Sequence, residues 1–481
     1  MSTFRVAPLL AACLALAGCG GGSIDNEAAI RVIQASPDLP LVNVLIDGVA
    51  VRSAIDYRGG TGLIFVTPRN YDFTFQAILP GDDAVVIDKP GTPILAGREY
   101  TLLAIGKAET PVSLPGSLQG LLIDNPVADT TSGNTRLQVV HAAPDEGQLD
   151  VYLTVRDSLG NYADLLGETP SAQVTYGENP ADRFEKPSGT YLIRITHAGT
   201  KTPVLFNSGE LAFRSRADFL LVAVTNTATG GAPISLVIND RTANLPVLDK
   251  DSPSDLRVVH VSPDAPALDV KGVGTSVVPT VCVPQVSPCP AVAPPPVTFA
   301  SGLAYLGFTS YVSAPPDTYN VSGVLTSDPN PTTAPFTFSR FLGIGQRATA
   351  FAAGLLATID DLVIADNFRP VFTEGQIRIV DAAPASGTVD VYIKATGTDI
   401  TLETATLFNL VLRSVTTYIP FTPGTYTVTF AESGTKTVLA SVEVPATAGR
   451  GFTAVLVDEV RVDASSDGKP PSVLLIDDQA P

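Results

Sequence analysis

The stretch that decides the fold is Leu256-Arg257-Val258-Val259-His260-Val261-Ser262-Pro263-Asp264. Three further segments match it: Ile30-Arg31-Val32-Ile33-Gln34-Ala35-Ser36-Pro37-Asp38, Leu137-Gln138-Val139-Val140-His141-Ala142-Ala143-Pro144-Asp145 and Ile377-Arg378-Ile379-Val380-Asp381-Ala382-Ala383-Pro384-Ala385. The prolines of neighbouring copies stand roughly 110 to 120 residues apart, which is close to the length of a small β-sandwich domain. A pattern that returns at this spacing identifies a folding unit, so the sequence predicts four related domains.

Each copy continues in the same way after its Pro turn. A second short apolar segment follows, at Val42–Val44, Leu149–Tyr152, Leu268–Val270 and Val389–Tyr392. A later turn is followed by a tyrosine, at Tyr71, Tyr191, Tyr319 and Tyr426. From Tyr426 onward, apolar and threonine residues alternate, which is typical of a strand with one buried and one exposed face.

These features predict an all-β chain of four immunoglobulin-like antiparallel β-sandwiches. The tyrosine after the turn resembles the tyrosine corner of that fold. The expected domain bounds are 28–126, 135–245, 255–368 and 376–480. Because the connectors between them are short, we expect a semi-extended array with limited flexing.

The segment from His260 to Val270 resembles the opening of a bacterial domain of unknown function, DUF4397. The third copy matches best and the second next. The first copy departs from the pattern at Gln34 and Asn43, and the fourth at Asp381 and Ala385. The resemblance implies tandem domains in an exported or lipid-anchored protein, and it implies no activity.

Residues 1–18 have the features of a signal peptide. Arg5 precedes an apolar run too short to span a bilayer. The segment Leu16-Ala17-Gly18-Cys19 resembles the lipobox of bacterial lipoproteins, which implies cleavage before Cys19 and a lipid anchor on that residue. Residues 19–27 then form a Gly-rich tether, and Gly20 after the cysteine favours the outer membrane by the same resemblance.

Two cysteines remain in the exported chain. Cys282 and Cys289 lie in a Pro-rich insertion of the third domain, from Pro279 to Pro296. In an oxidising compartment, a disulfide between them is the expected state. The spacing differs from that of a zinc site, and no histidine is near.

His141 and His260 occupy one position of the repeat, beside Asp145 and Asp264. They are either ligands or bases, or they hydrogen-bond the Pro turn, for which Gln34 and Asp381 supply equivalent atoms. We favour the structural role. His197 is expected in a surface turn.

The residues after the turn prolines have two interpretations as well. Asp38, Asp145 and Asp264 are either calcium ligands or turn formers, and the fourth copy has Ala385. We favour turn formation, so the sequence predicts no metal and no cofactor. The turn residues of the motif are then structural: Pro37, Asp38, Pro144, Asp145, Pro263, Asp264 and Pro384.

Composition limits the function further. The chain of 481 residues has 30 basic and 48 acidic residues and a net charge of −18, which disfavours nucleic acid as a partner. It has no Trp for stacking on sugars, although 13 Tyr and 20 Phe remain. It also lacks the nucleophile elbow, the phosphate-binding loop and the His-Glu-x-x-His pair of known enzyme classes.

The sequence therefore predicts a non-catalytic, lipid-anchored envelope protein that acts as a structural or interaction array. Its expected partners are the membrane, through Cys19, and unidentified protein or glycan ligands. An adhesin dependent on carbohydrate or calcium is the alternative, and a hydrolase is the weaker one.

Overall fold

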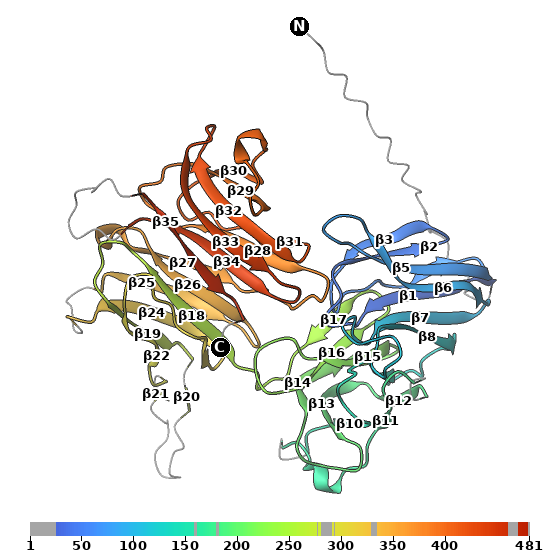
Figure 1. The fold of residues 1–481 in the computed structure, drawn as a ribbon. Helices are drawn as coiled ribbons and strands as arrows, with labels where there is room; N and C mark the ends of the chain where they lie inside the picture. Colours follow the sequence, from blue (N-terminus) through green and yellow to red (C-terminus); the bar gives the residue numbers. More distant parts are fainter. Residues whose placement is uncertain are drawn as a thin grey trace, which may run out of the picture.

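The computed structural model describes residues 26–157, 161–178, 182–276, 278–279, 291–292, 294–328, 334–459 and 470–479. The described chain consists of β-strands, loops and short 3-10 turns, η2 (Leu165–Gly167), η3 (Leu356–Thr358) and η4 (Ile400–Leu402). Within these ranges, no helix has the length and apolar character needed to cross a bilayer. The strands form four two-layered sandwiches in chain order (Figure 1), which confirms the all-β prediction.

Domains 1 and 2 occupy the first half of the chain. Domain 1 contains β1 (Ala28–Gln34), β2 (Val42–Ile46), β3 (Val49–Ile55), β4 (Ile64–Val66), β5 (Arg69–Ala77), β6 (Ala84–Ile94), β7 (Arg98–Ile105) and β8 (Gln119–Pro126). Domain 2 contains β9 (Asn134–His141), β10 (Leu149–Thr154), β11 (Ala172–Val174), β12 (Phe184–Pro187), β13 (Gly189–His197), β14 (Phe206–Phe213), β15 (Asp218–Thr225), β16 (Ile234–Asn239) and β17 (Asn244–Val247).

Domains 3 and 4 repeat the same order of strands. Domain 3 contains β18 (Ser254–Val261), β19 (Leu268–Gly274), β20 (Val278–Pro279), β21 (Ala291–Val292), β22 (Val297–Leu303), β23 (Val312–Ala314), β24 (Asp317–Leu325), β25 (Phe336–Leu342), β26 (Arg347–Ala353) and β27 (Asp360–Ala365). Domain 4 contains β28 (Gly375–Asp381), β29 (Val389–Ala395), β30 (Leu407–Leu410), β31 (Ile419–Phe421), β32 (Gly424–Glu432), β33 (Val438–Ala446), β34 (Gly451–Val457) and β35 (Ser472–Asp477).

In each sandwich, one sheet contains the motif strand and the other contains the strand that follows the Pro turn. The first, which we call the inner sheet, has the order β4-β1-β7-β8 in domain 1, β12-β9-β15-β16-β17 in domain 2, β23-β18-β26-β27 in domain 3 and β31-β28-β34-β35 in domain 4. The second, the outer sheet, has the order β3-β2-β5-β6, β11-β10-β13-β14, β22-β19-β24-β25 and β30-β29-β32-β33 in the same domains. The chain therefore crosses between the sheets at each Pro turn.

The motif strand has the same neighbour in every domain. β1 pairs in parallel with β7, β9 with β15, β18 with β26 and β28 with β34. The two strands of each pair are central in the inner sheet, and all other strand pairs are antiparallel in the described residues. The sequence predicted the strands but contained no signal for this parallel pair.

The two sheets differ in how many faces they bury. In the outer strand β24, buried residues alternate with partly exposed ones, as the sequence periodicity predicted. Every residue of the motif strand β18 is buried, because one face contacts the core of its own sandwich and the other contacts a second domain. Strands buried on both faces are near-continuous apolar runs, as Val258, Val259 and Val261 illustrate.

The second face of each inner sheet packs against another inner sheet. Domains 1 and 2 share an apolar cluster that includes Ile33, Leu103, Val140 and Val222. Domains 3 and 4 share a cluster that includes Val259, Phe351, Val380 and Val455. In Figure 1, β1 to β17 and β18 to β35 accordingly form two separate groups, each a pair of sandwiches.

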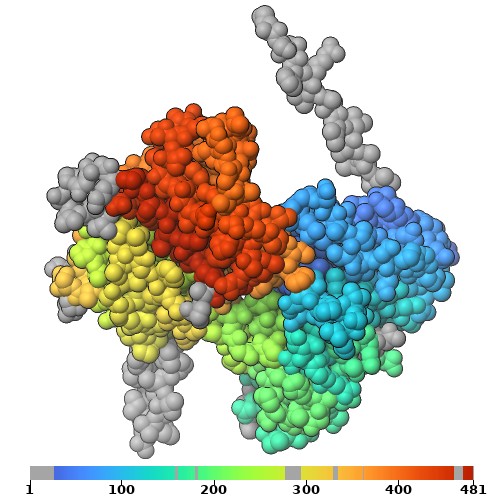
Figure 2. Space-filling view, in the orientation of Figure 1, coloured from blue at the N-terminus to red at the C-terminus, as the bar shows by residue number. Residues whose placement is uncertain are grey.

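This arrangement corrects the expected semi-extended array. The short connectors within each pair turn the chain back on itself, so that the inner sheets of domains 1 and 2, and those of domains 3 and 4, face each other. Burying an apolar face of a sheet contributes roughly 25 cal/mol for each square ångström removed from water. An extended array would leave these faces exposed and would lack this stabilisation. The two pairs also touch, and Figure 2 shows domain 4 beside domain 1.

Candidate functional site

The polar residue at the fifth position of each motif binds the turn that follows it. In each copy its side chain accepts a hydrogen bond from the backbone N–H two residues later: Gln34 from Ser36 at 2.6 Å, His141 from Ala143 at 3.3 Å, His260 from Ser262 at 3.3 Å and Asp381 from Ala383 at 3.1 Å. The four residue types thus perform one task, which supports the structural interpretation of this position.

The two motif histidines are held as neutral imidazoles. Nε2 of His141 lies 2.9 Å from the carbonyl of Gly147, and Nε2 of His260 lies 3.1 Å from that of Pro266. Since Nδ1 accepts from an amide, the proton belongs on Nε2. Burial lowers the pKa of both histidines, and both nitrogens of each ring bond backbone groups. His197 lies at the end of β13 with its side chain 43% exposed.

Asp381 is less suited to this position than the other three. It is fully buried, and within the described chain its Oδ2 lacks a hydrogen-bond partner. Burial raises the pKa of its carboxyl to about 6, despite the bond from Ala383 and aided by the nearby charge of Asp458. The ionised form is therefore unfavourable in the folded state.

We expect Asp381→Asn to stabilise domain 4 by about 1–2 kcal/mol at pH 7.5, because the amide keeps the acceptor and removes the charge. The sign follows from proton linkage. A carboxyl whose pKa is higher in the folded state than in the unfolded state stabilises the fold at a pH below its unfolded-state pKa. This contribution is lost as the pH rises through about 6. The advantage of the variant should therefore shrink toward pH 4, which urea unfolding across this pH range would measure.

Asp390 gives a matched control, because it is a buried aspartate with the opposite shift. Its carboxylate accepts from the amides of Asn409 and Gly434 and from the hydroxyl of Ser433. Burial alone would raise its pKa, but these hydrogen bonds outweigh burial and lower it. Asp390→Asn should destabilise the domain at pH 7.5, and equal effects of the two variants would contradict the assignment.

The residues of the Pro turn are engaged in local contacts. Each turn proline begins a two-residue turn. Asp38 accepts from the amides of Ala108 and Glu109, both at 2.8 Å, and Asp264 accepts from Leu356 at 2.7 Å. In domain 4, where Ala385 replaces the aspartate, Asp458 instead accepts from the amide of Ala385.

Asp145 differs from the other turn aspartates, since it forms an ion pair across the domain 1–2 interface with Lys107 at 2.8 Å. Across the described ranges, no three acidic, histidine or cysteine residues cluster as a metal site would require. Asp38 and Asp264 thus bind backbone amides of their own domains, and Asp145 binds the neighbouring domain.

The corner tyrosines behave alike in all four domains. Each hydroxyl donates to the carbonyl four residues upstream: Tyr71 to Thr67 at 2.8 Å, Tyr191 to Pro187 at 2.7 Å, Tyr319 to Pro315 at 2.7 Å and Tyr426 to Thr422 at 3.0 Å. The hydroxyl fixes the turn by which the chain crosses from the inner to the outer sheet, as in a tyrosine corner.

The second position of the motif forms a site that the sequence did not predict. Its side chain points out of its own sandwich and binds a residue at the end of β8, β16, β27 or β35 in the paired domain. In domains 1 and 2, Arg31 donates to Asn239 at 2.8 Å, and the amides of Gln138 and Asn125 bond each other at 2.9 and 3.1 Å. Each pair is therefore linked in both directions.

Domains 3 and 4 have ion pairs at the same positions. Arg257 donates to Asp478 and Arg378 to Asp366, both at 2.6 Å. Each of these four side chains is at most 3% exposed. The sequence contained a signal for these contacts. Each apolar motif strand has a polar residue at its second position, and the apolar strand near the end of each repeat is followed by an acid or an amide.

The two pairs differ in charge. Burial lowers the pKa of Arg31 to about 10, and its nearest acceptors, Thr101 and Asn239, are neutral. Burial also lowers the pKa of Arg257 and Arg378, but there the neighbouring carboxylates outweigh it and raise the pKa above its usual value. Only the interface of domains 3 and 4 depends on buried ion pairs at the motif position.

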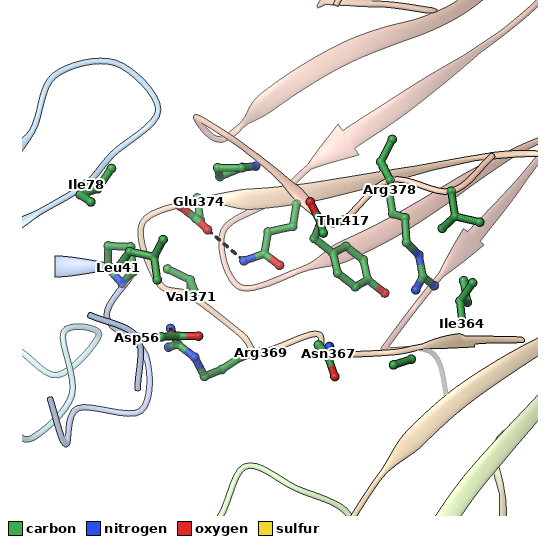
Figure 3. Close-up of a pocket in the computed structure, with 17 residues that line it drawn as sticks. Leu41, Asp56, Ile78, Ile364, Asn367, Arg369, Val371, Glu374, Arg378 and Thr417 are labelled. Carbon is green, nitrogen blue, oxygen red and sulfur yellow. Dashed lines mark hydrogen bonds and ion pairs between the residues drawn. The ribbon is translucent and has the colours of Figure 1, made fainter. Parts of the chain in front are cut away.

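The connector between domains 3 and 4 joins the two pairs. Arg369 donates to the carbonyl of Pro37 and to Asp56 of domain 1, both at 2.7 Å, and the amide of Phe372 donates to the carbonyl of Asp38. A cavity of about 340 Å³ lies beside this contact (Figure 3), with Leu41 and Ile78 on one side and Glu374 and Arg378 on the other.

A second cavity, which we call the junction cavity, has a volume of about 220 Å³. Its wall combines Tyr57 and Arg58 of domain 1, Thr227 to Thr229 of domain 2, Gly345 to Arg347 of domain 3 and Asp366 to Arg369 of the connector. It adjoins the cavity of about 340 Å³, since Asp56, Asn367 and Arg369 line both cavities.

Several predicted sites lie outside the described residues. These are the signal peptide, Cys19 with most of its tether, and the Cys282–Cys289 pair. The lipid anchor and the disulfide stay predictions from the sequence.

The model of the family described as "Domain of unknown function (DUF4397)" matches residues 28–152, 161–271 and 293–392. The chain belongs to the DUF4397 family. The first match covers domain 1 and continues into β10, and the third ends in β29, so the matches cross the domain boundaries. The opening strands of every domain thus fall within a DUF4397 match, and the family description assigns no activity.

Comparison with other proteins adds no function. No curated protein matches the chain. Among solved structures, the Bacillus anthracis TIE protein is 10% identical, over 89% of this chain and 68% of its own, with a TM-score of 0.16. A streptococcal ancillary pilin is 12% identical, over 69% of this chain and 100% of its own, with a TM-score of 0.15. At such TM-scores neither structure informs the fold of this DUF4397 chain.

Proposed function

We propose that this DUF4397 chain is a non-catalytic, lipid-anchored protein of the cell envelope, in which two pairs of sandwiches form a structural or interaction array. The observation that supports it most is the use of the motif itself. The recurring polar residues, such as His141, Arg257 and Asp478, are buried and bond turns or paired domains. The part of the sequence that recurs most is thus used for assembly.

The leader supports the place of action. A lipobox-like segment ending in Cys19 precedes a Gly-rich tether and a chain with strong negative charge. Lipid on Cys19 would hold the array at the outer membrane, with Cys282 and Cys289 joined as a disulfide in the insertion of domain 3. The partners of the array would be proteins or glycans of the envelope and not nucleic acid.

The anchor is tested by fractionating cells that express the full chain with Cys19→Ala. We expect the wild type in the membrane fraction and the variant in the soluble exported fraction, because the variant lacks the cysteine that carries the acyl chains. Cys289→Ser is the matched control, since it removes a cysteine outside the leader and should stay with the membrane.

Membrane association of the Cys19→Ala chain would contradict the lipid anchor. Protease treatment of intact cells, followed by mass spectrometry of the released peptides, then tests the interaction array. Release of peptides from domains 1 to 4 supports partners outside the cell, and protection of all four supports a periplasmic role.

A further inference from the structure

The junction cavity contains an arginine without an ion pair. Among the described residues, Arg58 has no carboxylate within ion-pair distance, and its buried Nη1 lacks a hydrogen-bond partner. Its guanidinium lies 5.5 Å from the ring of Tyr57. Burial lowers the pKa of Arg58, and the nearby charges of Tyr57 and Asp56 offset only part of this effect.

The other arginines around the cavity are paired. Arg369 binds Asp56 at 2.7 Å, and Arg347 lies 3.6 Å from Asp255. Behind the wall, Arg378 binds Asp366 and Arg257 binds Asp478. Figure 3 shows Arg369 beside Asp56, and both residues line the two cavities.

The carboxylates near Arg58 are already occupied. Asp366 accepts from Arg378, from the hydroxyl of Tyr311 at 2.8 Å and from that of Thr349 at 2.6 Å. Asp56 accepts hydrogen bonds from Arg369 and from the backbone amide of Tyr57. Glu374 lines the adjoining cavity and not this one. Arg58 is therefore the arginine of the cavity wall that has no carboxylate within ion-pair distance among the described residues.

The position of Arg58 in the backbone is also costly. Its φ is 65°, in the left-handed region where residues other than glycine are strained. The corresponding turn of domain 2 has Gly177, with φ 67°. The equivalent turns of domains 3 and 4 have Leu306 at φ 64° and Arg413 at φ 69°, so this conformation belongs to the repeated turn and not to the cavity.

We infer that the junction cavity binds a small organic acid through a single carboxylate, with Arg58 as the charged donor. The guanidinium of Arg58 offers one positive charge to a monoanion, and its planar shape matches a carboxylate in geometry. A volume of about 220 Å³ accommodates a molecule of the size of one sugar acid. The inference goes beyond the envelope role and does not depend on the lipid anchor.

Binding would also connect the two pairs of domains. The walls of the cavity belong to domains 1, 2 and 3 and to the connector that leads to domain 4. A carboxylate held there by Arg58 would lie against residues of the other domains. We therefore expect the acid to stabilise the contact between the pairs, in proportion to its occupancy.

The test is calorimetric titration of the detergent-solubilised full chain with sodium glucuronate, at constant ionic strength. We expect saturable binding of glucuronate and none of glucose, which has the same ring without the carboxylate. Inorganic phosphate is the third probe, and it should bind more weakly because its second charge is not compensated.

Arg58→Gln should weaken glucuronate binding by about tenfold or more, because a charge-assisted hydrogen bond is lost. The fold should survive, since no ion pair is broken and the backbone strain is unchanged. Arg69→Gln, an exposed arginine of the same domain, is the control and should bind as the wild type does. A thermal melt of each variant checks folding independently of binding.

Three results would overturn the inference. They are an absence of glucuronate binding to the folded wild type up to about 10 mM, unchanged binding by folded Arg58→Gln, and tighter binding of phosphate than of glucuronate. None of these results bears on the lipid anchor, so failure here and failure of the proposed function are distinguishable.

Discussion

Asp478→Ala will destabilise the pair formed by domains 3 and 4 by about 3–5 kcal/mol. Asp478 is 2% exposed and accepts hydrogen bonds from Arg257 and from the hydroxyl of Thr453, both at 2.6 Å. Its removal leaves the charge of Arg257 buried without a partner. The penalty is that of an uncompensated buried charge, which far exceeds the net contribution of an intact ion pair.

The neighbouring residue is a matched control. Asp477 also forms an ion pair, with Arg450, but both side chains are partly exposed to solvent. Surface ion pairs contribute about 0–1 kcal/mol, so Asp477→Ala should have an effect in that range. Two adjacent aspartates, both paired with arginine, should thus differ several-fold in their effect.

Amide hydrogen exchange is the suitable measurement, because a chain of four domains does not unfold in one step. With Asp478→Ala, protection should fall in β18, β26, β28 and β34, on both sides of the interface, and stay unchanged in domains 1 and 2. A loss confined to domain 4 would contradict the pairing, as would equal effects of the two alanine variants. Asp478→Asn, which keeps an acceptor for Thr453, should show an intermediate loss.

The features that the sequence predicted are local ones. The four repeats, the Pro turns and the corner tyrosines depend on residues close together in the chain. Tyr71 and Tyr191, for example, bond carbonyls four residues away. The polar residue at the fifth motif position is likewise bonded two residues on, so its role follows from spacing alone.

The pairing of the domains could not be predicted in the same way. Arg31 with Asn239 and Arg257 with Asp478 are more than 200 positions apart. Gln138 with Asn125 and Arg378 with Asp366 are 13 and 12 positions apart, but they meet only because the chain turns back between two domains. A near-continuous apolar strand shows that both faces are buried, but it does not show what covers the second face. The expectation of a semi-extended array failed for this reason. The junction cavity was even less accessible to sequence, since it needs the two pairs in contact.

The two interfaces are alike in geometry and different in chemistry, which has a consequence for specificity. An arginine facing Asp366 or Asp478 is neutralised, but Gln138 in that position would leave a buried carboxylate without its cation. Domains 2 and 3, adjacent in the chain, would therefore pair poorly. The motif position thus disfavours the pairing of domain 2 with domain 3 or 4, whereas Arg31 of domain 1 is compatible with either kind of partner.

Phe351→Ala will destabilise the contact between domains 3 and 4 by about 3–5 kcal/mol, the usual cost of deleting a buried phenyl group. Phe351 lies in β26 and is fully buried, in a cluster with Val259 of its own domain and with Val380 and Val455 of domain 4. The ring belongs to the shared cluster and not to the core of domain 3. Its removal should therefore open the interface more than it unfolds its own sandwich.

Phe341 of β25 is the control, because it belongs to the same domain and is 64% exposed. Phe341→Ala should change stability by less than about 0.5 kcal/mol. Hydrogen exchange in β28 and β34, which neither substitution touches in sequence, reports the interface. Faster exchange there in Phe351→Ala, and not in Phe341→Ala, is expected. If domain 4 keeps full protection while domain 3 loses it, Phe351 stabilises only its own sandwich, and the face-to-face packing of the inner sheets is wrong.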